Sequence, residues 1–246
     1  MPYLLAIDSG NSFLKWGIHD GNQWLTQDKV SQDDILLLKD SWSHIPSPTS
    51  IIVSCVTHTI LRDKLSLLLF SIWPIEPRWI SALPRQCGVS NGYTDPYQLG
   101  SDRWAALVAA WAIQRQSCLV INVGTAMTVD ALSVPGKFIG GIILPGQQLM
   151  FKSLKANTQL DSFQNGCYED FPSNSGNAIY NGVLHSLIGA IERMYSLLSL
   201  HAGQPLGNCI ISGGGAVMLL PYIKLPYMII DNLVLEGLMI IASDTQ

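Results

Sequence analysis

Apolar and polar positions alternate with a period of two near the start of the chain, which is the pattern of a half-buried strand. The stretch FLKWGI at residues 13–18 has this alternation. An Asp20-Gly21 pair follows it, and the run QWLTQDKV at residues 23–30 comes next. Because Asp-Gly is typical of tight hairpin turns, we expect two strands joined at this pair.

The rest of the chain alternates between helical and strand patterns. Helices are predicted at residues 32–42, 60–72, 102–116 and 177–200, strands at 50–56, 117–132 and 209–214, and an amphipathic final segment at 232–243. Residues 74–101 hold too many Pro and Gly residues for a regular element, and a long loop in a compact domain is usually functional. The order of elements predicts an α/β fold.

The amino-acid composition limits the classes of partner that the chain can bind. The chain has 246 residues, 48% of them hydrophobic, with a formal net charge of -4, so it can bury a core as one large or two modest domains. It has no block of Lys or Arg, which argues against nucleic acid and favours small molecules. The most apolar stretch, at residues 67–73, is far shorter than a membrane span, and no leader is evident, so we expect a cytoplasmic protein.

Cysteine and histidine usage points away from disulfides and zinc. The five cysteines are an odd number and form no CxxC pair. The histidines form no HExxH pair. We therefore expect reduced thiols in the core.

Two apolar strands run into a similar polar turn. The first is LLAIDSGNS, with Asp8 and Gly10, and the second is LVINVGTAM, with Asn122 and Gly124. The match indicates an internal duplication, although Asp and Gly are also ordinary turn residues. Glycine lets backbone N–H groups approach an anion, so two facing turns could clamp a polyphosphate, with an acid holding Mg²⁺. The two common nucleotide fingerprints, GxxxxGK[ST] and GxGxxG, are absent.

A third glycine cluster, SGGGA at residues 212–216, follows the apolar run NCII. One interpretation is a plain strand-to-helix turn. The other is a surface where an adenine ring lies flat against the backbone.

These three turns, in this order, resemble the acetate and sugar kinase, Hsp70 and actin superfamily, and more narrowly the type III pantothenate kinases. The motifs that carry the narrower resemblance span nearly the whole chain: DSGNSFLKWG, GYTDPYQLGSDR, NVGTAMTVDAL, GGIILPG, NSGNAIYNG, ISGGGA and LVLEGL. The resemblance implies an α/β fold of two ribonuclease H-like (actin-like ATPase) domains, residues 1–115 and 116–246, with a nucleotide cleft between them.

The resemblance also implies a reaction, the transfer of the γ-phosphoryl group of ATP to the primary hydroxyl of pantothenate, the first step towards coenzyme A. ATP and Mg²⁺ are the implied cofactors, and Asp8 is the implied metal ligand. The implied nucleotide-binding residues are Asp8, Ser9, Gly10, Asn11, Ser12 and Lys15 in the first motif, Gly124 and Thr125 in the second, and Gly213 and Gly214 in the third.

The family's proton acceptor matches Asp102 in LGSDR. A carboxylate suits this role because it can accept the proton of the attacking hydroxyl. The alternative is that Asp102 only caps the helix that begins RWAALV. Arg103 could bind the carboxylate of pantothenate in a forked pair. The implied substrate-binding set is Tyr93, Gly100, Ser101, Asp102, Arg103 and Ser175.

The chain departs from the family pattern at three positions. Asn122 replaces an Asp that holds a monovalent cation in the family, so a K⁺ or NH₄⁺ site becomes doubtful. Ser175 replaces a substrate-binding Thr, and Ser12 stands where Thr is frequent, and both keep a hydroxyl. The proposed proton acceptor is unaffected.

The resemblance further implies a homodimer, with pantothenate and ATP as small-molecule partners and no nucleic acid or membrane. A candidate seam is the apolar stripe of Ile179, Val183, Leu187, Ile191 and Tyr195, for which core packing within one chain is the alternative. Two other functions stay open. They are a related small-molecule kinase, and a catalytically weak nucleotide-binding accessory or regulatory protein.

Overall fold

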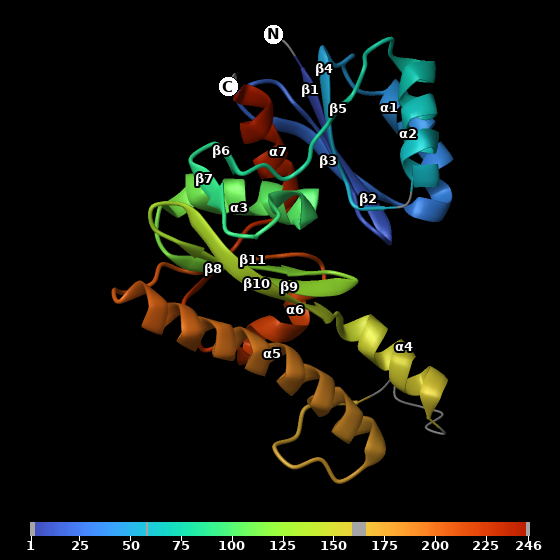
Figure 1. Ribbon diagram of the computed structural model, residues 1–246. Helices are drawn as coiled ribbons and strands as arrows, with labels where there is room; N and C mark the ends of the chain where they lie inside the picture. The colour runs from blue at the N-terminus through green and yellow to red at the C-terminus, as the bar shows by residue number, and fades with distance from the viewer. Residues whose placement is uncertain (1–2, 58, 159–165, 245–246) are drawn as a thin grey trace. The chain divides into compact units, whose positions relative to one another are not determined.

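The computed structural model describes residues 3–57, 59–158 and 166–244, and its helices and strands alternate along the chain (Figure 1). The chain forms two compact units. Unit 1 contains the described residues up to Arg115, then Pro135–Phe138 and those from Asn232 onward, and unit 2 contains Gln116–Val134 and Ile139–Asp231. The domain limits predicted from the sequence, at residues 115 and 116, remain a prediction.

Unit 1 is built on a five-stranded sheet of order β3-β2-β1-β4-β5. Its strands are β1 (Leu4–Ser9), β2 (Phe13–His19), β3 (Trp24–Ser31), β4 (Ser50–Cys55) and β5 (Arg78–Trp79). β1 pairs antiparallel with β2 and parallel with β4. The predicted hairpins at the start of the chain and the strand at 50–56 are therefore confirmed.

The two faces of this sheet differ because side chains alternate along each strand. Leu5 and Ile7 of β1 pack in one apolar cluster with α1 (Leu38–Ser43) and α2 (Thr59–Ile72). Asp8 points to the opposite face, which α3 (Ser101–Gln114) and α7 (Leu233–Ser243) cover (Figure 1). A carboxylate in a buried strand is thus placed beneath the helix layer.

Helices α3 and α7 pack closely against each other in unit 1. Gly237 of α7 lies directly on the backbone of Ala105, where a Cβ atom would come within 1.9 Å of the Ala105 carbonyl oxygen. α3 is buried along most of its length. The close contact therefore holds the helix that carries Asp102 and Arg103.

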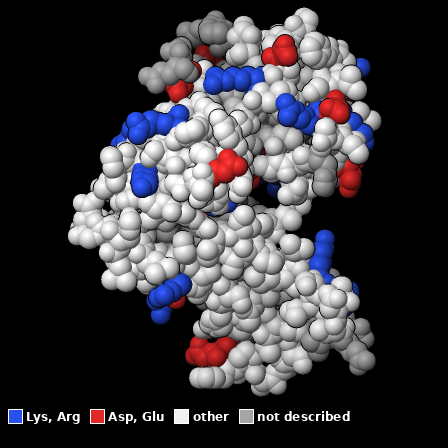
Figure 2. Space-filling model, viewed as in Figure 1, with Lys and Arg blue, Asp and Glu red and all other residues white. Residues whose placement is uncertain are grey.

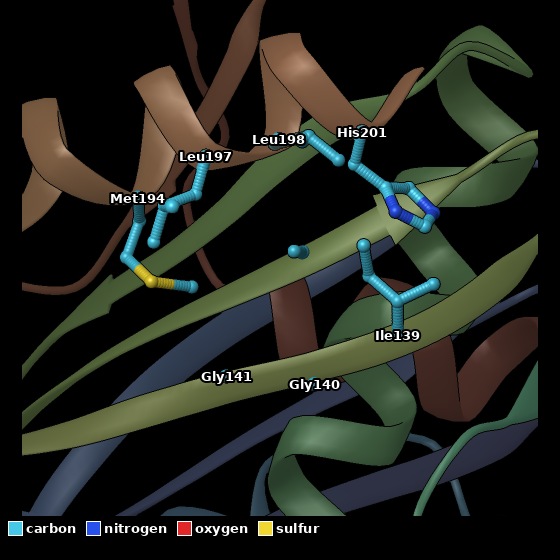
Figure 3. Close-up of a pocket in the computed structure, with 8 residues that line it drawn as sticks. Ile139, Gly140, Gly141, Met194, Leu197, Leu198 and His201 are labelled. Atoms are coloured by element: carbon cyan, nitrogen blue, oxygen red, sulfur yellow. The ribbon is translucent and has the colours of Figure 1, made fainter.

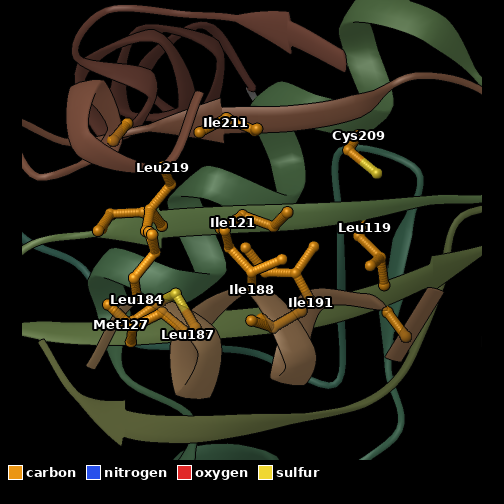
Figure 4. Packing of buried hydrophobic residues seen from close by; sticks show 14 of the residues in the cluster. Leu119, Ile121, Met127, Leu184, Leu187, Ile188, Ile191, Cys209, Ile211 and Leu219 are labelled. Atoms are coloured by element: carbon orange, nitrogen blue, oxygen red, sulfur yellow. The ribbon is translucent and has the colours of Figure 1, made fainter. Parts of the chain in front are cut away.

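Unit 2 contains a sheet with the strand order β12-β11-β8-β9-β10. Its elements are β8 (Cys118–Val123), β9 (Ala126–Ser133), β10 (Lys137–Pro145), α4 (Gln147–Asn157), α5 (Ser175–Ala202), β11 (Cys209–Ser212), α6 (Ala216–Leu219), the 3₁₀ helix η3 (Leu220–Tyr222) and β12 (Tyr227–Ile229). The first two residues of β10 belong to unit 1, where they pair with β7 (Val89–Asn91). The core of unit 2 forms where α5 packs on β8 and β9, as Figure 4 shows.

The apolar stripe of α5 belongs to this core. Val183, Leu187 and Ile191 are buried, and Tyr195 packs against them. In Figure 4, Leu187 and Ile191 point towards the strands of their own sheet. From Val183 to Tyr195 the stripe is therefore covered within the chain, while Ile179 is half-buried. The prediction of the stripe as a dimer seam was wrong, because an apolar helix face next to a sheet packs on that sheet first.

Three local expectations also differ from the structure. The helix predicted at 32–42 begins as a 3₁₀ helix, η1 (Gln32–Leu37), because Asp34 has a non-helical backbone (φ -105, ψ 19) that breaks the turn before α1. The loop 74–101 contains the short strands β5, β6 (Arg85–Gln86) and β7 and the 3₁₀ helix η2 (Pro96–Gln98). Neither β10 nor α4 was predicted from the sequence. No residue of α4 is buried, so its sequence lacks the apolar period that marks a helix packed on a core.

The surface is weakly patterned in charge. On the face drawn in Figure 2, the Lys and Arg side chains of the described residues mostly stand apart from one another. Surface charge therefore marks no extended binding face on this side.

Among the described residues no helix combines the length and the apolar character that a membrane crossing requires.

The α3–α7 contact predicts a large effect of a single methyl group. Gly237→Ala should lower the free energy of unfolding by about 1–3 kcal/mol, because the new Cβ overlaps the Ala105 backbone and the helices must separate. Gly189→Ala, in the exposed face of α5 where a Cβ meets nothing, is the matched control and should be neutral or stabilising by up to about 1 kcal/mol. Thermal or urea unfolding measures both, and equal stability of the two variants would contradict the packing argument.

Candidate active site

The first of the glycine-containing motifs, DSGNS at residues 8–12, forms the tight turn between β1 and β2. The Gly10 N–H donates to the Phe13 carbonyl at 3.1 Å and closes the turn. Gln32, at the start of η1, braces it from one side, because its side-chain amide donates to the Gly10 carbonyl and its backbone N–H donates to the Ser12 carbonyl. Asn11 and Ser12 remain exposed. The turn is thus fixed, with polar side chains directed to solvent where an anion could bind.

Asp8 precedes this turn and is buried, with only 9% of its surface exposed. Its Oδ1 has no hydrogen-bond partner among the described residues. Lys15 is its register partner on β2 and is half-buried. Burial, and then the charge of Asp102, raise the pKa of Asp8 to about 7, and Lys15 opposes them. An orphaned buried carboxylate oxygen of this kind fits a cation ligand, because Mg²⁺ binds through one or two carboxylates and keeps several waters.

Asp102 lies at the start of α3 and is close enough to Asp8 for their charges to interact. The helix begins at Ser101 with Gly100 as its N-cap, so Asp102 lies inside the first turn and is not the cap. The Arg103 N–H donates to Asp102 Oδ1 at 2.7 Å. Burial raises the pKa of Asp102, while that hydrogen bond and the Arg103 charge lower it. The alternative that Asp102 only caps this helix therefore does not hold.

Arg103 is buried among aromatic side chains. Its Nη1 donates to the Tyr93 hydroxyl at 3.1 Å. The guanidinium carbon lies 5.8 Å from the ring centroid of Tyr93 and 5.9 Å from that of Phe138, within cation–π range. The structure therefore brings together two residues of the predicted substrate-binding set, Tyr93 and Arg103, and adds Phe138.

In unit 2 the second and third motifs lie side by side. β8 and β11 are parallel, and Asn122 is the register partner of Ser212. The Gly215 N–H donates to the Val123 carbonyl at 3.0 Å. Gly213 has φ +97, and a Cβ there would lie 2.7 Å from Asn122 Oδ1, so only glycine fits. Asn122, Gly124 and the SGGGA turn thus form one surface at the ends of two neighbouring strands.

Two further predicted positions are the turn at Gly124 and Thr125 and the start of α5 at Ser175. The Gly124 N–H donates to the Ala126 carbonyl at 2.9 Å, and the Gly146 N–H donates to the Thr125 carbonyl at 2.8 Å, which fixes the second turn. Ser175 is the first residue of α5 and is exposed, next to the N-cap Asn174.

Sequence reasoning missed three supporting residues. They are Ser54, Gln32 and Phe138. Ser54 had a usable signal, because it is a polar residue within the apolar run IIVSCV and occupies the strand position that Asp8 occupies in LLAIDS. Gln32 and Phe138 gave no such signal.

An open cavity of about 350 Å³ lies elsewhere in unit 2 (Figure 3). Met194, Leu197, Leu198 and His201 of α5 line one side, and Ile139 and its neighbours on β10 line the other. None of the predicted site residues lines this cavity. Its walls are mainly apolar, so it does not supply phosphate chemistry.

Solved structures with a similar fold come first. A conserved Campylobacter jejuni protein, described as a Baf family transcriptional activator, superposes with a TM-score of 0.57 at 21% identity, covering 97% of each chain. The activator of the 2-hydroxyisocaproyl-CoA dehydratase from Clostridium difficile, with bound ADPNP, superposes with a TM-score of 0.53 at 12% identity, covering 98% of this chain and 92% of the other. The chain therefore shares the α/β fold of these proteins, which confirms the expected fold class.

Sequence comparison then gives the family. The profile described as "Type III pantothenate kinase" matches residues 4–197. The type III pantothenate kinase of Nitrosospira multiformis is 48% identical over 244 residues, which covers 99% of this chain and 92% of the relative. The chain therefore belongs to the type III pantothenate kinase family.

The buried Asp8 predicts a specific dependence of stability on pH. In the folded protein it holds its proton up to about pH 7, whereas the unfolded chain releases it near 3.8. In that window the native state binds more protons than the unfolded state, so burial of Asp8 makes the free energy of unfolding fall as pH rises. Without Mg²⁺, Asp8→Asn should gain stability relative to wild type across this window, by roughly 4 kcal/mol at most.

Asp20→Asn serves as the control, because backbone hydrogen bonds from Gln23 and Asn22 lower the pKa of exposed Asp20, and this variant should gain nothing above pH 4. Urea unfolding at a series of pH values in EDTA measures the difference. Parallel pH profiles for Asp8→Asn and wild type would show that the Asp8 carboxyl titrates normally in the fold.

Proposed function

We propose that this chain phosphorylates pantothenate with ATP, and that Asp102 accepts the proton of the attacking hydroxyl. The observation that carries the proposal is the pair of neighbouring carboxylates, the buried Asp8 and the half-buried Asp102, beside the turn that follows β1. Family membership supports the substrate. A raised pKa suits a proton acceptor, because general bases work best when their pKa approaches the working pH.

The chain's own residues divide the work. Phosphoryl transfer needs positioning and charge neutralisation more than covalent chemistry. We assign phosphate binding to the turn Gly10–Ser12 with Lys15, and to the turn Gly124–Thr125. We assign adenosine binding to Gly213 and Gly214, whose backbone offers a surface without side chains.

The substrate-side residues are those around α3 and the start of α5. Arg103, held by Tyr93, offers a guanidinium for the carboxylate of pantothenate. Gly100 and Ser101 form the approach to Asp102, and Ser175 retains the hydroxyl of the family's Thr. Near Asp102, the substrate hydroxyl would lose its proton as the new P–O bond forms.

Asp8 is the residue we assign to Mg²⁺, which neutralises phosphate charge when bound. Its orphaned Oδ1 supports this role. We also infer a cytoplasmic homodimer from the family resemblance, with a seam other than the buried stripe of α5. A monomeric mass in light scattering would contradict the dimer.

Release of ADP from ATP and Mg²⁺ by the purified protein, with and without pantothenate, tests the function. We expect release that depends on pantothenate, with phosphorylated pantothenate as the second product. Binding of ATP without turnover would instead support an accessory nucleotide-binding protein. Turnover with a sugar or another acid, but not with pantothenate, would point to a related kinase.

Asp102→Asn should reduce kcat by roughly 10²- to 10⁴-fold, because an amide cannot accept the proton, while ATP binding survives. Asp95→Asn is the matched control, since Asp95 is an exposed cap of η2 in the same loop region, and it should keep near-normal turnover. Steady-state kinetics and calorimetric ATP binding separate the two effects. Near-normal kcat in Asp102→Asn would remove the proposed base.

Asn122 should weaken any dependence on K⁺. A carboxylate beside phosphates needs a neutralising cation, whereas a neutral amide does not. We expect similar activity in sodium or Tris buffer and in K⁺, and we expect Asn122→Asp to increase the response to K⁺. A wild-type enzyme that is inactive without K⁺ and fully restored by it would mean that other ligands hold the ion.

A further inference from the structure

The start of α3 is tied to the sheet of unit 1 by a buried hydrogen bond between two serines. Ser54 Oγ of β4 lies 2.9 Å from Ser101 Oγ. Ser54 is fully buried and Ser101 is 6% exposed. A buried hydroxyl without a hydrogen-bond partner lowers the stability of the fold, so each serine depends on the other for its hydrogen bond.

The strand register places this bond next to the two carboxylates. Ser54 is the parallel register partner of Asp8, and side chains at partner positions point to the same face of a sheet. Ser101 directly precedes Asp102 along α3. One side of the hydrogen bond is therefore fixed to the strand beside Asp8, and the other side is fixed to the helix turn that carries Asp102.

The orientation of Asp102 depends on where this helix begins. The N-cap Gly100 supplies no side-chain hydrogen bond. Asp102 Oδ1 is turned back over Gly100, where a Cβ atom would come within 2.6 Å of it, and it accepts the Arg103 N–H at 2.7 Å. A rotation or shift of the first turn of α3 would move this carboxylate, and Gly100 leaves room for it to move.

We propose that Ser54 is a positioning residue for the reaction, holding the first turn of α3 through Ser101 so that the Asp102 carboxylate faces the substrate hydroxyl. This proposal rests on the proposed role of Asp102. Ser54 has no exposed surface and does not touch the substrate itself. Its effect comes from geometry, because a reacting group displaced by a fraction of a bond length loses much of its rate advantage.

Kinetics of Ser54→Ala test the proposal. We expect kcat to fall by about 10-fold or more, while the KM for ATP stays within about twofold. Ser101→Ala removes the other partner, and the double variant should be no slower than the slower single variant, because the two residues act as one unit. Ser117→Ala, a buried serine of unit 2 whose Oγ accepts the Val134 N–H at 3.0 Å, is the control and should leave kcat unchanged.

The Asp102→Asn background separates positioning from a general structural effect. If Ser54 acts through Asp102, then Ser54→Ala should cause no further loss of kcat when the carboxylate is already gone. An equal loss on both backgrounds would overturn the proposal and mean that Ser54 merely stabilises the fold. Should Ser54→Ala fail to fold in a thermal melt, Ser101→Ala on both backgrounds makes the same comparison.

The failure of this proposal is distinguishable from failure of the proposed base. Normal kcat in Ser54→Ala beside a severely impaired Asp102→Asn would overturn the positioning role and leave the base in place. Near-normal kcat in Asp102→Asn alone would overturn both.

Discussion

The structure depends on one electrostatic constraint, which is that the buried carboxyl group of Asp8 in β1 lies close to the half-buried one of Asp102 at the start of α3. Burial makes both Asp8 and Asp102 harder to ionise, and the charge of Asp102 further raises the pKa of Asp8. Lys15 and Arg103 offset part of this cost. If Asp8 binds Mg²⁺ and Asp102 accepts the proton, as we propose, these two carboxylates would meet two needs of phosphoryl transfer from ATP to a hydroxyl.

The fold supplies this constraint through a repeated local design. In unit 1 the turn after β1 follows Asp8, and the parallel neighbour β4 places Ser54 beside it. In unit 2 the turn after β8 follows Asn122, and the parallel neighbour β11 places Ser212 beside it. Each turn is closed by a glycine N–H that donates to a carbonyl on the next strand. The two units thus share one strand arrangement, with an ionisable carboxyl group in the first copy and a neutral amide in the second.

The parts of this arrangement that lie in local motifs could be predicted from the sequence. The hairpin around Gly10, the turn around Gly124 and the helix that begins near Asp102 each follow from apolar runs broken by polar and glycine residues. The contacts of Phe138 could not be predicted, because it reaches Arg103 from a strand outside the predicted elements. The buried stripe of α5 shows the same limit, since its period is equally consistent with a core and with an interface.

The titration of Asp8, followed by carboxyl ¹³C chemical shifts in the purified protein, tests the central constraint most directly. Without Mg²⁺ the account predicts an apparent pKa of about 7 for Asp8. It also predicts that Mg²⁺ with ATP lowers this pKa, because a bound cation favours the charged carboxylate. An Asp8 that titrates near 4 both with and without Mg²⁺ and ATP would contradict the account, since the carboxylate would then be neither desolvated nor coupled to Asp102.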